Sequence, residues 1–108
     1  MFPKGGMGKM MKQAQELQAK MAKAQAELGD INVEANSGGG MIVVGANGNK
    51  EITSIKINPE VLEEDVDLLE DLILAATNQA LTKATEAAEE KMNSATGGLM
   101  GQFKMPGM

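Results

Sequence analysis

Lysine side chains are the most concentrated binding chemistry in this sequence. Five of the ten lysines lie within the first 23 residues: Lys4, Lys9, Lys12, Lys20 and Lys23. Residues 1–28 hold these five lysines against two acids, a net charge of +3, while the other 80 residues hold five lysines against 13 acids, a net charge of −8. This separation favours a polyanion as the partner of the basic segment. The simpler interpretation is that the lysines only keep a helix in solution.

The residue types restrict how a nucleic acid can be recognised. The chain has no arginine, only two aromatic residues and no helix-turn-helix pattern, so the usual devices for reading base edges are missing. Lysine contacts phosphate oxygens, which carry no sequence information. Binding of this kind is broad in sequence and sensitive to salt.

A heptad repeat of apolar residues runs through the same basic segment and predicts a helix over about residues 7–28. The positions expected to form a dimerisation seam are Met7, Met10, Ala14, Leu17, Met21 and Ala24. The repeat is compatible with packing on the chain's own second helix or on a second copy, and the strict seven-residue spacing favours a narrow helix-to-helix contact. A dimer brings ten N-terminal lysines onto one particle.

Composition excludes several other classes of function. The sequence contains no Cys and no His, which removes disulfides, thiolate metal sites and the usual general base near neutral pH, so we expect no enzyme activity and no cofactor. Methionines on the first helix, or the acidic cluster between residues 63 and 71, are weak candidates for a metal site, because methionine fills seams and carboxylates favour helix N-termini. We expect no metal.

Hydropathy predicts neither a signal peptide nor a membrane span. The N-terminus has no apolar run of signal-peptide length, and the most apolar stretch, residues 68–76, is interrupted by Glu70 and Asp71. The expected location is the cytoplasm, without a membrane partner.

The middle of the chain alternates polar and apolar residues, which predicts three strands over about residues 31–58. Residues 37–40 join the first two strands, and Asn47-Gly48-Asn49 joins the second pair, with Asn-Gly expected to supply positive φ angles. Ile52 breaks the alternation beside this turn and predicts a bulge. The result is an antiparallel meander.

Pro59 ends the third strand, and a short helical turn is expected there before a second helix over about residues 66–95. Asp65 or Asp67 is the expected N-cap. Leu68 and Leu74 widen its apolar stripe, which predicts burial on more than one face. The fold class is therefore α+β, in the order α-β-β-β-α, as one domain over residues 1–98 with a flexible tail over residues 99–108.

The order of these elements and their residues resembles the YbaB/EbfC family of bacterial nucleoid-associated proteins over nearly the whole chain. The matching segments are Gly8-Lys9-Met10-Met11-Lys12-Gln13-Ala14-Gln15 in the first helix, Asn58-Pro59-Glu60-Val61-Leu62 after the third strand, Leu69-Glu70-Asp71-Leu72-Ile73 with Ala75-Ala76-Thr77-Asn78-Gln79-Ala80 in the second helix, and Glu90-Lys91-Met92 near its end.

The resemblance implies a tweezer-like homodimer whose helices project from a sheet body and admit double-stranded DNA between them. It implies loose sequence preference, altered DNA conformation, and roles in nucleoid organisation and gene expression, with no small-molecule substrate. On the second helix it points to Asn78, Lys83 and Lys91 as further DNA contacts. The alternative is a non-enzymatic protein–protein interaction module, a small acidic dimeric adaptor.

Overall fold

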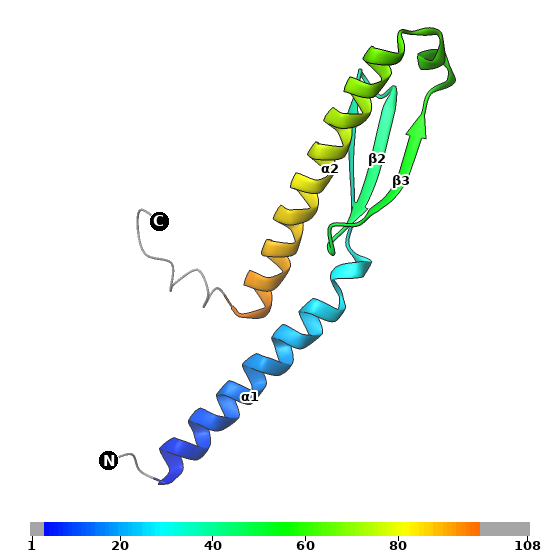
Figure 1. Cartoon of the computed structure of the whole chain (residues 1–108). Coiled ribbons are helices and arrows are strands. Elements are labelled where there is room, and N and C mark those ends of the chain that lie inside the picture. Colours follow the sequence, from blue (N-terminus) through cyan, green and yellow to red (C-terminus); the bar gives the residue numbers. More distant parts are fainter. Residues whose placement is uncertain (1–3, 98–108) are drawn as a thin grey trace, which may run out of the picture. The chain divides into compact units, whose positions relative to one another are not determined.

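The computed structural model describes residues 4–97, with side chains described from Gly8 onward. The elements are helix α1 (Lys4–Ala26), the 3-10 turn η1 (Leu28–Asp30), strands β1 (Asn32–Ser37), β2 (Ile42–Asn47) and β3 (Ile52–Ile57), the 3-10 turn η2 (Pro59–Glu63) and helix α2 (Val66–Ala95) (Figure 1). The α+β class and the element order predicted from the sequence are confirmed. The tail over residues 99–108 lies outside the described residues.

The described chain divides into two compact units. One comprises residues 28–89, with the sheet and most of α2; the other comprises residues 4–27 together with residues 90–97. The single domain over residues 1–98 stays a prediction.

Helix α1 begins at Lys4 and ends at Ala26. Its start lies three residues before the predicted start, and its end lies two residues before the predicted end. The chain leaves the α-helix here because the carbonyl of Leu28 accepts hydrogen bonds from the amides of Ile31 at 3.2 Å and Gly48 at 2.9 Å. A Cβ atom at position 48 would collide with that same carbonyl oxygen, so only glycine permits this approach.

The three strands form an antiparallel sheet in the order β1-β2-β3, as the meander prediction required. Between β2 and β3, Gly45 faces Ser54 but Ala46 faces Ile52, so Thr53 is an extra residue. This register shift confirms the irregularity predicted beside Ile52.

The turn between β2 and β3 differs from its prediction. The positive φ angle belongs to Lys50, at 63°, and not to Gly48. The side chain of Asn47 explains the difference, because its Oδ1 accepts hydrogen bonds from the amides of Asn49 at 2.9 Å and Glu51 at 3.2 Å. This side-chain turn replaces the tight Asn-Gly hairpin.

The turn η2 and the start of α2 follow the predicted order. Asn58 caps η2 by accepting a hydrogen bond from the amide of Glu60 at 3.0 Å. Helix α2 begins at Val66, and the carbonyl of Asp65 accepts from the amide of Leu69 at 3.1 Å, which places Asp65 at the N-cap position. Its carboxylate is placed favourably for the helix dipole.

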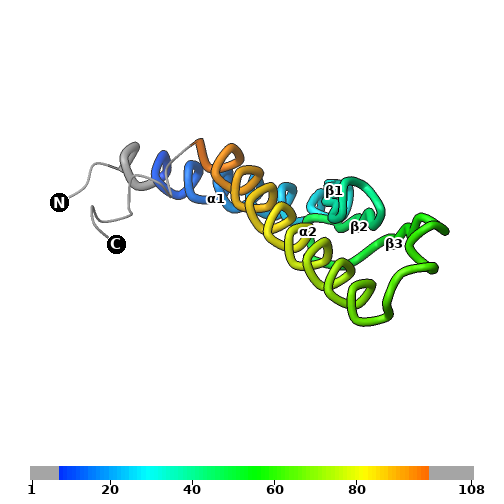
Figure 2. Tube along the Cα trace, turned by 90° about the horizontal axis from the view of Figure 1, so that it is seen from above, coloured from blue at the N-terminus to red at the C-terminus, as the bar shows by residue number. Residues whose placement is uncertain are grey.

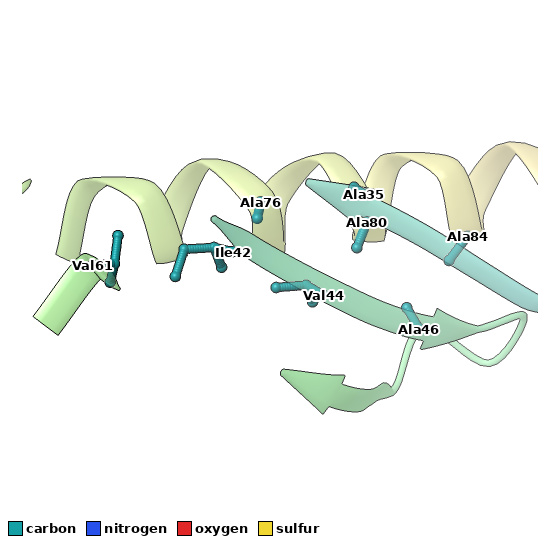
Figure 3. Close-up of a cluster of buried hydrophobic side chains, with 8 residues drawn as sticks. All are labelled: Ala35, Ile42, Val44, Ala46, Val61, Ala76, Ala80 and Ala84. Carbon is teal, nitrogen blue, oxygen red and sulfur yellow. The ribbon is translucent and has the colours of Figure 1, made fainter. Parts of the chain in front are cut away.

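A stripe of alanines packs α2 onto the sheet. Ala76, Ala80 and Ala84 are fully buried against β2, and they point toward the strand that carries Ile42 and Val44 (Figure 3). Two perpendicular views show α2 lying along the sheet (Figures 1 and 2). Ser37 adds a polar tie, since its hydroxyl donates to the carbonyl of Leu72 at 2.6 Å.

Strand β3 is left outside this contact. All six of its residues are exposed, including Ile52, Ile55 and Ile57. These isoleucines pair in register with the buried residues Ala46, Val44 and Ile42, so they lie on the side of the sheet that α2 occupies without being covered by it.

The prediction that α2 is buried on more than one face is wrong for the single chain. Leu68 is 42% exposed and Leu74 is 60% exposed. The sheet presents one face to one side of the helix, so residues on the flanks of the alanine stripe stay open. Within residues 4–97, no helix is both long enough and apolar enough to cross a membrane.

Replacing Ala80 with leucine tests the close contact between α2 and the sheet. Overpacking a filled core typically costs 1–3 kcal/mol, so Ala80→Leu should lower the free energy of unfolding by about 2 kcal/mol in urea denaturation. Ala22→Leu places the same side chain at an exposed position of α1 and should change it by less than about 0.5 kcal/mol. Equal effects of the two variants would contradict the tight packing; both are measured at one protein concentration, since association adds to apparent stability.

Candidate nucleic-acid interface

Four of the predicted lysines occupy one face of α1. Lys9 and Lys20 are eleven residues apart, as are Lys12 and Lys23, and eleven residues make just over three turns of an α-helix. The four Cα positions therefore fall within an arc of about 80° and span roughly 21 Å along the helix axis. All four residues are exposed. Lys4 lies in the first turn of α1, about a quarter-turn away from this row.

The apolar stripe of α1 runs beside the lysine row, and the exposure of its side chains changes along the helix. Ala24 is 2% exposed, Leu17 and Met21 are half-buried, and Met10 is 57% exposed. The buried part of the stripe faces the C-terminal end of α2, since Leu17 and Ala95 line the same pocket. Ala14 is exposed. The C-terminal half of the predicted seam is thus partly occupied by the chain's own residues.

Two open pockets lie between α1 and the end of α2. The first, of about 480 Å³, is lined by apolar residues of the seam together with Gln13, Glu16 and Lys20. The second, of about 340 Å³, is lined by Lys20, Lys23, Glu27, Lys91 and Ser94. Lys20 and Ala95 line both, so the pockets adjoin.

The three candidates on α2 have different surroundings. Lys91 joins the pocket of Lys20 and Lys23, where its ammonium group lies 3.3 Å from the carboxylate of Glu27. Lys83 belongs to the other unit, and its Nζ donates to the carbonyl of Glu34 on β1 at 2.9 Å. Asn78 is exposed in a shallow depression beside Thr82 and Glu86. Lys91 lies in the same unit as the lysines of α1, whereas Lys83 and Asn78 belong to the other unit.

Charge is divided between the two units even more sharply than along the sequence. The segments 4–27 and 90–97 hold six lysines against three acids, a net charge of +3, whereas residues 28–89 hold three lysines against 12 acids, a net charge of −9. A phosphate chain is therefore attracted to the first unit and repelled by the second.

Two polar residues of this site were not predicted from the sequence. Glu27 and Ser94 line the pocket with the lysines. The position of Glu27 four residues after Lys23 is a local signal for a pair on one helix face, but its contact with Lys91 joins segments 64 residues apart and depends on the fold. Among the described residues, no group of three or more metal-ligating side chains is arranged to hold a metal ion.

Comparison with known proteins identifies the family of this chain. The model of the YbaB/EbfC DNA-binding family matches residues 4–99. A protein named nucleoid-associated protein from Pelotomaculum thermopropionicum is 50% identical over 105 residues, covering 96% of each chain. Another of the same name from Ruminiclostridium cellulolyticum is 49% identical over 112 residues, covering 99% of this chain and 95% of the relative.

A solved structure supports the fold. The crystal structure of the uncharacterized protein HP0035 from Helicobacter pylori superposes with a TM-score of 0.63 at 20% identity, covering 83% of this chain and 92% of that one. The family model and the relatives confirm the resemblance drawn from the sequence, and the family is described by DNA binding rather than by a reaction. The chain belongs to the YbaB/EbfC DNA-binding family.

Proposed function

We propose that this protein is a nucleoid-associated protein that binds double-stranded DNA through backbone phosphates with little sequence preference. The observation that carries the proposal is the row of four exposed lysines on one face of α1. A span of roughly 21 Å corresponds to about six base pairs at 3.4 Å each, enough to meet several phosphates of one duplex. Lys4 and Lys91 extend the proposed surface, with Asn78 and Lys83 as weaker candidates.

The charge of the rest of the chain supports a confined contact. The net charge of −9 on residues 28–89 repels DNA from the sheet and from most of α2. The relatives' names place them with the nucleoid, and we extend that location in the cytoplasm to this chain. Altered DNA conformation, nucleoid organisation and an influence on gene expression are the proposed consequences. No catalytic step is part of the proposal.

The working form is proposed to be a homodimer in which a second copy covers the apolar side of β3. Ile52, Ile55 and Ile57 are 38%, 49% and 40% exposed on an edge strand that also offers unpaired backbone groups. Such a strand is a template for pairing with another chain, and a two-fold axis lets identical strands pair antiparallel. The seam on α1 stays an alternative contact, and its member Met10 is 57% exposed.

A protein-interaction module is the second candidate. Exposed side chains on α2, among them Leu74 at 60% exposure, offer an apolar surface for a protein partner. The lysine row has no role in this interpretation, which therefore accounts for less of the molecule. Capture experiments before and after nuclease treatment separate the two, because a bridge made of DNA disappears with the nuclease.

Removing two lysines from the row should weaken DNA binding more than removing two elsewhere. Each phosphate contact contributes about 0.9 to the slope of log affinity against log salt, so four to six contacts give a slope of about −4 to −5 for the wild type. Lys9→Gln with Lys20→Gln should lower affinity about tenfold and reduce the steepness of the slope by about 2. Fluorescence anisotropy with a labelled duplex measures both quantities.

The matched control is Lys50→Gln with Lys56→Gln, which changes the net charge equally in the acidic unit. It should stay within about threefold of the wild type. Comparable losses in the two double variants would remove the lysine row from the interface. Absence of any binding by the wild type at micromolar protein and about 50 mM salt would remove DNA as the partner.

An acid on the apolar side of β3 should dissociate the proposed dimer. Sedimentation velocity should give the wild type twice the chain mass of 11.3 kDa. Ile55→Asp should give a monomer, since it buries an unpaired charge in the contact. Ser54→Asp adds the same charge to the opposite face of the strand and should leave the dimer intact.

The variant Leu17→Asp places the acid in the predicted seam of α1 instead. If this variant is monomeric while Ile55→Asp stays dimeric, the contact between copies lies on α1 and not on β3. A wild-type protein that sediments as a monomer at all concentrations contradicts the homodimer itself.

A further inference from the structure

The pocket between the end of α1 and the end of α2 is lined by more positive side chains than negative ones. Lys20 and Lys23 are three residues apart on one face of α1. Lys91 and Ser94 have the same spacing on α2. Three ammonium groups and a hydroxyl therefore line one pocket of about 340 Å³. All of these groups can donate hydrogen bonds to the oxygens of an anion.

Glu27 supplies the one carboxylate in this lining, and it leaves the pocket with an excess of two positive charges. Its Oε1 lies 3.3 Å from Nζ of Lys91, with the two side chains 40% and 38% exposed. It also follows Lys23 by four residues, the spacing of neighbours on a helix face. The carboxylate thus occupies the place that an external anion needs beside Lys91.

An ion pair of this kind is easily exchanged. Partly exposed pairs contribute little to stability, because water solvates both charges and ordering the two long side chains costs entropy. A backbone phosphate carries two non-bridging oxygens that share its negative charge, and each can accept hydrogen bonds from more than one of the donors. Exchange of the Glu27 carboxylate for a phosphate therefore keeps Lys91 paired while it recruits Lys20 and Lys23.

We propose that this pocket is a subsite for a backbone phosphate of DNA, and that Glu27 is an internal competitor for Lys91 that limits the affinity of the site. The inference rests on the proposed function and adds a regulator of its strength. Glu27 holds Lys91 when no DNA is bound and repels an incoming phosphate. DNA binding is weakened by this one carboxylate far more than by acids of the other unit.

The test is a double-mutant cycle on Glu27 and Lys91, read by anisotropy with a labelled duplex at low salt. Glu27→Gln should bind three- to tenfold more tightly than the wild type, because one repulsive charge is removed and Lys91 is released. Lys91→Gln alone should lose less than about threefold, since Glu27 already occupies this lysine. In the double variant most of the gain from Glu27→Gln should vanish.

Glu60→Gln is the control for net charge, since it removes one exposed carboxylate from the acidic unit. Its affinity should stay within about twofold of the wild type, because this exposed carboxylate lines neither of the two pockets beside α1. The circular dichroism spectrum and the thermal midpoint should be unchanged in all variants, which excludes misfolding as the cause of an altered affinity.

A second measurement uses inorganic phosphate as the probe, without DNA. In titrations followed by amide NMR, the signals of Lys91 and Ser94 should shift at lower phosphate concentration in Glu27→Gln than in the wild type. A shift confined to free phosphate, with no gain for the duplex, would show an anion pocket that DNA does not use, and this outcome overturns the proposal.

The remaining outcomes are also decisive. If the wild type binds DNA but Glu27→Gln is within twofold of it, the proposal is wrong while the proposed function stands. If the gain from Glu27→Gln persists in full in the Lys91→Gln background, competition for Lys91 is excluded. If the wild type does not bind DNA at all, the proposed function fails first.

Discussion

The close approach of α2 to β2 through Ala76, Ala80 and Ala84 is the contact on which the sheet unit depends. Alanine has the smallest side chain that still favours a helix, so the helix backbone lies near the strand without leaving a void. The cost is a thin core, in which Ile42, Val44 and Val61 are the largest fully buried side chains. A helix seated this closely covers two strands well and leaves the third uncovered.

Because the core is thin, association with a second copy would add to the stability of the fold. A domain of about 100 residues buries only some two-thirds of its unfolded surface. In this chain several large apolar side chains are also exposed to solvent. The isoleucines of β3 and the leucines on the flanks of α2 are residues that a second copy would remove from water. The proposed contact on β3 and the lysine row on α1 belong to different units, so self-association and phosphate binding would use different residues.

Local patterns in the sequence were sufficient for the elements and for the lysine row. Heptad spacing and alternation identify helices and strands, and eleven-residue spacing follows from the numbering alone. Two of the three errors have tertiary causes. Helix α1 ends early because Gly48 approaches Leu28, the turn is organised by the side chain of Asn47, and Leu68 and Leu74 stay exposed because the sheet is one layer deep on one side. Only the hydrogen bonds of Asn47 are local in sequence, because they join residues two and four positions apart.

The pocket of the lysines shows the same limit for function. Composition identifies positive charge on α1, but the availability of each lysine depends on what lies beside it. Lys83 donates to a backbone carbonyl and Lys91 faces a carboxylate, while the lysines of α1 are exposed. A chain that binds DNA only through phosphates has no base contacts with which to adjust its affinity. The remaining means are the number of free lysines and the carboxylates placed next to them, and Glu27, 3.3 Å from Lys91, is one such carboxylate.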